Sequence, residues 1–225
     1  VGVNSMEAAL EYAPLKVADA LGAEIILAGA SQNSWRRDRK YKALCEAYPT
    51  YFQVPEGLGP CKDDPEWLER FYMNSAYQTS NLPKLDTLIM PCGSGNSTIS
   101  VLLGLATYNF ENLPENICLA ILGHDSNGQM RKTVEAHIRT CLGKNKLAHG
   151  LFESAERWPV YPKSEYGTKC KGKQEYDGIV FHPNYEAKVW KKMVEQRPEL
   201  IAEGNSYWIV GDEPRVEQFT SQETA

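Results

Sequence analysis

A glycine-rich segment at residues 92–98, CGSGNST, is the part of the chain best suited to bind an anion. Glycines let a backbone close around a ligand, and the first N–H groups of a following helix point toward it. No Gly-Lys-Ser/Thr follows, so this is not a Walker A loop, and the third glycine of G-x-G-x-x-G is missing. A phosphate monoester fits this chemistry, and the alternative is a small-residue turn that joins a strand to a helix. The candidate ligands are Gly93, Ser94, Gly95, Asn96 and Ser97.

A second polar segment, AGASQNSWRR at residues 28–37, also follows an apolar run and precedes a helical pattern. The Asn33 amide could contact a ligand oxygen, and Arg36 or Arg37 could neutralise an anionic group. Taken alone, such a segment is typical of a helix N-cap cluster. If both polar loops follow strands of one sheet, they are expected to face a common ligand-binding crevice.

A third segment, FHPNYEAKVW at residues 181–190, places Tyr185 and Glu186 where a helix begins. The helix dipole stabilises a carboxylate at that position whether or not a ligand is bound. On this ground alone the segment is structural.

The elements that carry these segments alternate between helix and strand. Apolar spacing predicts a strand at 85–92, a helix at 97–109 and a strand at 116–122, so the glycine-rich loop lies at the carboxyl end of a parallel strand. Further helices are predicted at 5–21, 34–49, 129–142 and 184–198, and further strands at 23–30 and 206–214, whereas 150–175 is predicted to be a polar loop. The pattern predicts an α/β fold with an open, mostly parallel sheet and helices on both faces.

From the length of 225 residues we expect either a single compact α/β unit or two lobes. In the two-lobe division, residues 1–54 join a reduced small lobe at 55–84, and residues 85–215 form the lobe with the glycine-rich loop. Residues 216–225 are predicted to be a frayed tail.

Composition narrows the class of protein. A net charge of −5 gives no reason to expect a nucleic-acid partner. No apolar run approaches the ~20 residues that span a bilayer, so no membrane partner is expected. The six cysteines contain no C-x-x-C pair and the four histidines are far apart, so we expect a cytoplasmic protein with reduced thiols and no metal site.

The three polar segments, in this order, resemble the tryptophan-synthase-β-like (fold type II) family of pyridoxal-phosphate enzymes, most closely its 1-aminocyclopropane-1-carboxylate deaminase and D-cysteine desulfhydrase branch. ALGAEIILAGASQNSWRR is similar to the family's helix, strand and Q-S-N-H loop, CGSGNST to its phosphate cup, and GIVFHPNYEAK to its D-P-V-Y-E/T-G-K segment. The resemblance implies a shortened fold of this type, with the cofactor phosphate in the loop at 93–98. It places Asn33 beside the cofactor ring, Tyr185 near the substrate and Glu186 at the pyridine nitrogen.

The same resemblance implies a lyase or deaminase that acts on an amino acid or amine through a carbanion at its α-carbon. Relatives in this family are commonly dimers, so a homodimer is implied as well.

One departure concerns the family's Schiff-base lysine, which follows an asparagine at the start of the first helix. In GVNSMEAAL, alignment on Asn4 puts Ser5 at the lysine position, and counting back from Gly22 without gaps puts Glu7 there. Ser5 is therefore the candidate catalytic residue, and the cofactor would be held non-covalently. Three hypotheses stay open: an enzyme with a relocated lysine, a degenerate member that serves binding or assembly, and an unrelated α/β protein that binds a nucleotide or sugar phosphate.

Overall fold

The computed structural model describes residues 7, 10, 13–25, 42–43, 46–47, 72–73, 75–124, 128–165, 168–183 and 185–209. The chain divides into two compact units, Val1–Val54 with Glu213–Ala225, and Pro55–Asp212. Most of the first unit lies outside the described residues, and so does the expected strand at 23–30 beyond residue 25. Its described helix is α2, Ala13–Ala20, after which Gly22 adopts a positive φ of 81°. The lobe boundaries expected from the sequence stay a prediction.

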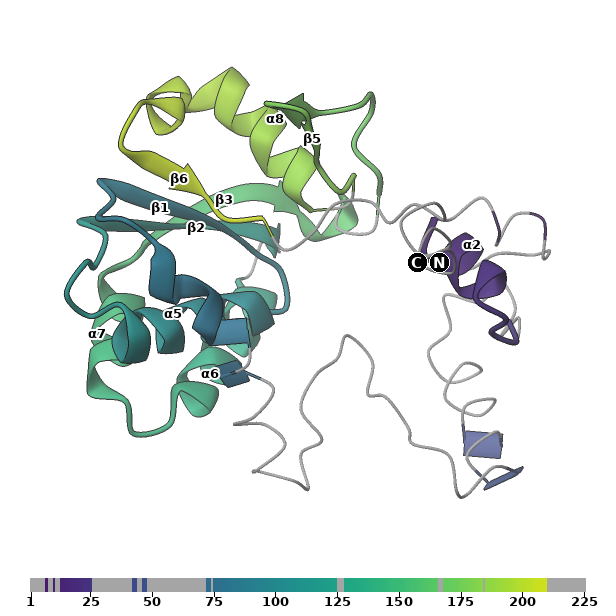
Figure 1. The fold of residues 1–225 in the computed structure, drawn as a ribbon, viewed down its shortest axis with the longest axis horizontal. Helices are drawn as coiled ribbons and strands as arrows, with labels where there is room; N and C mark the ends of the chain where they lie inside the picture. The colour runs from purple at the N-terminus through teal and green to yellow at the C-terminus, as the bar shows by residue number, and fades with distance from the viewer. Residues whose placement is uncertain are drawn as a thin grey trace, which may run out of the picture. The chain divides into compact units, whose positions relative to one another are not determined.

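The second unit contains a four-stranded parallel sheet in the order β3-β2-β1-β6, so the fold is α/β as expected (Figure 1). Its main elements, in chain order, are β1 (Thr87–Cys92), α5 (Asn96–Tyr108), β2 (Asn116–His124), α6 (Gln129–Leu142), α7 (Lys146–Ser154), β3 (Glu156–Pro162), α8 (Glu186–Gln196) and β6 (Asn205–Tyr207). Short 3-10 helices complete it: η2 (Tyr77–Asn81), η3 (Lys163–Glu165) and η4 (Pro198–Ile201).

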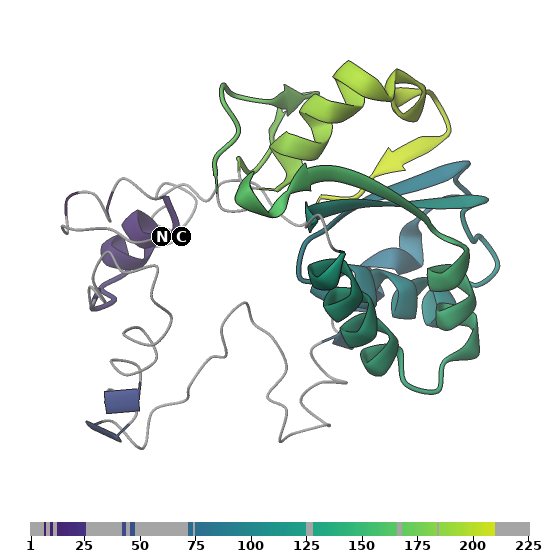
Figure 2. The same cartoon turned by 180° about the vertical axis from the view of Figure 1, so that it is seen from behind.

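Helices cover both faces of the sheet. One face packs against α5, α6 and α7, and the other packs against α8 (Figures 1 and 2). Successive residues of β1 alternate between these two layers, since Leu88 and Met90 belong to the first core and Ile89 to the second. A strand that is buried on both faces needs apolar residues at successive positions. The sequence LIMPC at residues 88–92 is such an uninterrupted apolar run.

The strand order places a topological switch point beside β1. From β1 the chain moves outward to β2 and then β3, and it returns to place β6 on the other side of β1. Because the helix after β1 lies on one face and the helix before β6 lies on the other, the loops at the carboxyl ends of these strands diverge and leave room for a ligand.

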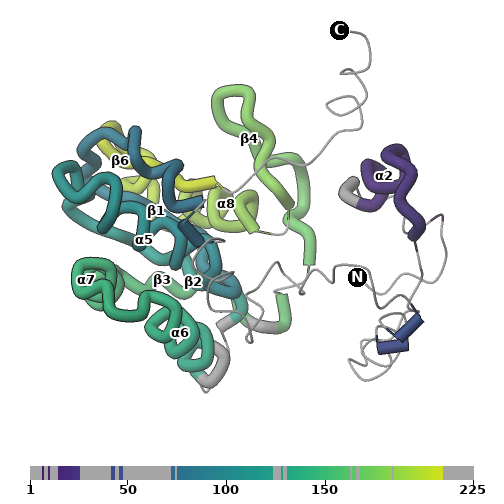
Figure 3. Tube along the Cα trace, turned by 60° about the horizontal axis from the view of Figure 1, so that its bottom comes forward, coloured from purple at the N-terminus to yellow at the C-terminus, as the bar shows by residue number. Residues whose placement is uncertain are grey.

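Two elements contradict the expectation of a polar loop at 150–175. Residues 146–154 form α7, and residues 156–162 form β3, the edge strand of the sheet. β3 contains Pro159 and Pro162, which lack the N–H of a sheet ladder and are tolerated on an edge strand. Figure 3 shows α6 and α7 side by side, an arrangement held by an ion pair between Arg139 and Glu153.

The segment before α8 does not join the main sheet. β4 (Glu175–Tyr176) and β5 (Ile179–Val180) pair with each other as an antiparallel hairpin. The last expected strand is present as β6, which ends at Tyr207, and residues from 210 onward lie outside the described part. Within the described residues, no helix has both the length and the apolar character that a membrane crossing requires.

Candidate functional site

The glycine-rich loop joins the carboxyl end of β1 to α5, as the sequence predicted, and the strand order puts it at the switch point. Gly95 is the N-cap of α5 and has a φ of 90°, in the left-handed region that favours glycine. A Cβ built on Gly95 would lie 2.8 Å from Cγ1 of Ile138 on α6. Both the conformation and the close approach to α6 therefore require glycine, and the loop presents the N-terminus of a 13-residue helix to the carboxyl edge of the sheet.

Hydroxyl groups surround this helix start. Ser94 is exposed and Ser97 is half-buried. Thr98 is buried, and its hydroxyl oxygen has no hydrogen bond of normal geometry within the described residues. Burial raises the pKa of the Cys92 thiol to about 11, and an interaction with the Thr98 hydroxyl opposes the rise. A hydroxyl at a helix N-terminus that makes no well-formed hydrogen bond within the protein can donate to an anion.

The side chain of Asn96 is already engaged within the protein. Its Oδ1 lies 3.0 Å from the Tyr72 hydroxyl, which donates to it, and 3.2 Å from Nε2 of His137. His137 in turn lies 3.6 Å from Sγ of Cys141, one turn further along α6. Asn96 thus ties the start of α5 to its neighbours, and any contact with a ligand from its amide stays a prediction.

This cluster of Tyr72, Asn96, His137 and Cys141 was not expected from the sequence. The only sequence signal is the i, i+4 spacing of His137 and Cys141, which places them on one face of a helix. Burial raises the pKa of the Cys141 thiol and of the Tyr72 phenol, so both stay protonated near neutral pH. Among the described residues, no group of three or more His, Cys, Asp or Glu side chains could hold a metal ion.

Tyr185 and Glu186 lie at the start of α8, as expected. α8 connects β3 to the parallel strand β6, so its N-terminus lies at the carboxyl edge of the sheet, the same edge as the glycine-rich loop. The Glu186 side chain is 3% exposed, and its charge raises the pKa of the buried Tyr207 phenol further than burial alone. Tyr185 is 38% exposed and stacks on His182 with 5.6 Å between ring centroids.

Ser5 and Asn33 lie outside the described residues. Their roles beside the cofactor stay predictions, as does the role of the segment at 28–37.

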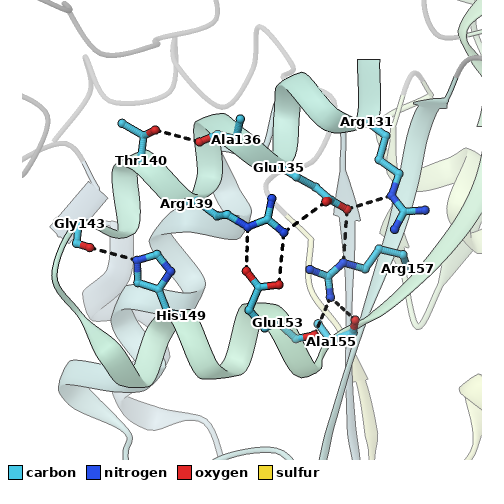
Figure 4. A network of polar contacts seen from close by, with 10 residues as sticks. All are labelled: Arg131, Glu135, Ala136, Arg139, Thr140, Gly143, His149, Glu153, Ala155 and Arg157. Atoms are coloured by element: carbon cyan, nitrogen blue, oxygen red, sulfur yellow. Dashed lines mark hydrogen bonds and ion pairs between the residues drawn. The ribbon is translucent and has the colours of Figure 1, made fainter. Parts of the chain in front are cut away.

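A network of charges joins α6 to α7 and β3 (Figure 4). The carboxylate of Glu135 contacts Arg131 at 2.9 Å, Arg139 at 3.5 Å and Arg157 at 3.6 Å, and Arg139 also pairs with Glu153. The cavity between this network and Gly93 has a volume of about 10 Å³. A space of that size holds at most about one water molecule, so it is too small for a substrate.

A larger hollow of about 490 Å³ lies at the opposite edge, where Thr87, Asn116 and Glu156 begin their strands. Its charged side chains already pair with each other, because Arg197 bonds both Glu156 and Glu199. This hollow contains none of the residues that the sequence predicted for the site.

The fold and the site define an α/β protein with a glycine-rich loop at the switch point of a parallel sheet. No protein-family model matches the chain. The chain is 24% identical over 262 residues to the O-seryl-dTMP PLP-dependent decarboxylase of Salmonella phage ViI. This similarity takes in 96% of the chain but 62% of the relative, so the chain spans less than two thirds of the relative's length. The likeness agrees with the resemblance to pyridoxal-phosphate enzymes and supports that cofactor.

Proposed function

We propose that this chain is a pyridoxal-phosphate-dependent enzyme of the tryptophan-synthase-β-like type, related to the 1-aminocyclopropane-1-carboxylate deaminase branch. The observation that carries the proposal is the loop at Gly95, where a glycine-only conformation opens a helix N-terminus at the switch point. The phage relative supports the cofactor independently, because its name states that it depends on pyridoxal phosphate.

The residues present fit the phosphate and the ring of this cofactor. The first N–H groups of α5 and the buried Thr98 hydroxyl offer donors to a phosphate dianion. At the same edge, the buried carboxylate of Glu186 fits a protonated ring nitrogen. When bound, the cofactor supplies an electron-withdrawing ring that stabilises negative charge at the α-carbon of an amino acid or amine.

The chain's own residues would hold and orient this group. Gly95 lets the loop close on the phosphate, while Glu186 would keep a proton on the ring nitrogen and so maintain the ring's electron demand. Tyr185, which is accessible and stacked on His182, would contact the substrate. The resemblance adds Asn33 beside the ring and Ser5 at the position of the usual lysine.

For the reaction, we favour a lyase that removes a group from the α-carbon of an amino acid. The relative's name combines decarboxylation with a seryl group carried on dTMP. A nucleotide-linked amino acid is accordingly the substrate class to test first, followed by free amino acids and amines.

A second candidate is a degenerate member that binds the cofactor or its phosphate without catalysis. The observation that favours it is the sequence GVNSMEAAL, in which neither Ser5 nor Glu7 can form an imine. Binding of pyridoxal phosphate without turnover of any amino-acid substrate would support this alternative.

Replacing Gly95 with alanine tests the phosphate cup. We expect the dissociation constant for pyridoxal phosphate, measured by absorbance titration, to rise at least about tenfold. An alanine at this φ is strained, and its Cβ must displace the side chain of Ile138, which together cost about 1–3 kcal/mol.

Gly143→Ala is the matched control, because Gly143 also has a positive φ but a Cβ there would meet nothing within 4 Å. It should bind the cofactor as the wild type does. Equal affinity of the Gly95→Ala protein, or a wild type that binds nucleotides but not pyridoxal phosphate, would contradict the proposed function.

A further inference from the structure

The start of α5 is fixed by contacts from helix α6. Ile138 of α6 leaves room only for glycine at position 95, since a Cβ there would lie 2.8 Å from its Cγ1. The preceding residue of α6, His137, reaches the next residue of the loop, and its Nε2 lies 3.2 Å from Oδ1 of Asn96. Two successive residues of α6 thus set the positions of Gly95 and Asn96.

The contact with Asn96 determines which nitrogen of the His137 ring carries the proton. A carboxamide oxygen only accepts hydrogen bonds, so Nε2 is the protonated nitrogen and the donor. Sγ of Cys141 lies 3.6 Å from Nδ1 and 3.9 Å from Nε2, and only the unprotonated Nδ1 can accept from that thiol. Both ring nitrogens therefore have a partner in α5 or α6.

Asn96 is held from a second side as well. The hydroxyl of Tyr72, a buried residue ahead of η2, donates to the same Oδ1 at 3.0 Å. The two donors occupy both lone pairs of this oxygen, which holds the amide group in one orientation. Because Asn96 is the first residue of α5, the helix start cannot turn without breaking these bonds.

This helix start supplies the backbone donors of the proposed phosphate site. The first backbone hydrogen bond of α5 runs from the N–H of Ile99 to the carbonyl of Gly95 at 2.9 Å. The N–H groups of residues 96–98 consequently have no acceptor within the helix. Donors that already point in one direction bind an anion more tightly than donors that must first be ordered.

We propose that His137 is a positioning residue for the cofactor phosphate, because by holding Asn96 it directs the N–H groups of residues 96–98 toward that anion. It acts through Asn96 and makes no contact of its own with the cofactor. This inference rests on the proposed function. A purely structural role would instead lower stability and weaken every ligand equally.

The test compares pyridoxine phosphate with pyridoxine, which differ only in the phosphate and lack the aldehyde that reacts with lysines. Their dissociation constants are measured by calorimetry on the full chain. The amide of His137→Asn lies near the position of Nδ1 and cannot reach Asn96. We expect its dissociation constant for pyridoxine phosphate to rise about three- to tenfold, whereas the constant for pyridoxine should change by less than about twofold.

Two further variants sharpen this assignment. His137→Gln carries an amide N–H near the position of Nε2 and should restore most of the phosphate affinity. His149→Asn is the matched control, since Nε2 of His149 lies 3.0 Å from the carbonyl of Gly143, in a contact that involves no residue of the loop. It should bind pyridoxine phosphate as the wild type does.

A measurement on the wild-type protein tests the same hydrogen bond without any variant. Long-range ¹H–¹⁵N NMR spectra at pH 8, where imidazole side chains are ordinarily neutral, report which ring nitrogen is protonated. We expect the Nε2–H form for His137, and we expect its signal to shift when pyridoxine phosphate, but not pyridoxine, is added. This spectrum decides the assignment if His137→Asn does not fold.

Other results overturn the inference in distinguishable ways. An Nδ1–H form of His137, a signal that does not respond to the phosphate, or a His137→Asn protein that loses affinity for both ligands equally or for neither removes the positioning role and leaves the proposed function standing. A wild-type protein that binds neither pyridoxine phosphate nor pyridoxal phosphate removes both.

Discussion

The variant Gly104→Ala is expected to lose about 2–3 kcal/mol of unfolding free energy, although alanine is the better helix former. Gly104 lies in the middle of α5, where that helix packs against the segment that ends in η2. A Cβ at this position would overlap the carbonyl oxygen of Ala76 and the hydroxyl of Thr79. Those two atoms form a buried hydrogen bond with each other at 2.8 Å, and a backbone carbonyl cannot swing aside as a flexible side chain can.

The measurement is thermal and urea unfolding of the full chain, with an expected fall in Tm of roughly 5–10 °C. Gly150→Ala in α7 is the control, because a Cβ there meets nothing within 4 Å. It should gain about 0.5–1 kcal/mol from helix propensity. If both variants change stability equally, the close approach of α5 to Ala76 is not a constraint on the fold.

The central strand–loop–helix–strand unit could be predicted from the sequence because its signals are local. The central residues of β1 and β2 are apolar, since both faces of these strands are buried, and a glycine-rich segment marks the start of α5. α6 was predicted with its exact bounds because its apolar residues follow the helical period.

β3 could not be predicted in this way, because an edge strand has weaker constraints. Trp158 and Val160 are buried, but the residues between and before them are charged or proline, so the segment ERWPVYP resembles a loop. Its place in the sheet is fixed by pairing with β2, a contact that lies far away in the sequence. The sequence pattern did not predict α7 either, because its place in the fold depends on packing against α6 and against α5, which is distant in the sequence.

In the candidate site, too, the features set by local sequence could be predicted, and those set by contacts between distant residues could not. The place of the glycine-rich loop before α5 and of Glu186 at the start of α8 could be inferred from short motifs at helix starts. The engagement of Asn96 with Tyr72 and His137 could not, because those partners lie 24 and 41 residues away.

Glu135→Gln is expected to destabilise the protein by about 2 kcal/mol near neutral pH. Glu135 is surrounded by three guanidinium groups, and Arg157, whose side chain is 11% exposed, also stacks on the Phe152 ring at 4.4 Å. Removing one partner of a fully buried pair costs about 3–5 kcal/mol, and the value here is smaller because Glu135 is 15% exposed. Glu115→Gln, in an exposed pair with Lys84, is the control and should change stability by less than about 0.5 kcal/mol.

The pH dependence of this effect has a definite sign. Burial acts to raise the pKa of Glu135, but the hydrogen bond from Arg131 and the charges of Arg157 and Arg139 outweigh it, so the pKa is lower than its usual value. A carboxylate whose pKa is depressed by folding stabilises the native state above its unfolded pKa of about 4.3, and this contribution is lost as the pH falls through the folded value. The stability difference between wild type and Glu135→Gln, measured by urea unfolding from pH 7 to pH 3, should therefore narrow in acid. A difference that stays constant over this range would mean that the Glu135 charge does not hold α6 to β3, and that apolar packing alone holds these two elements together.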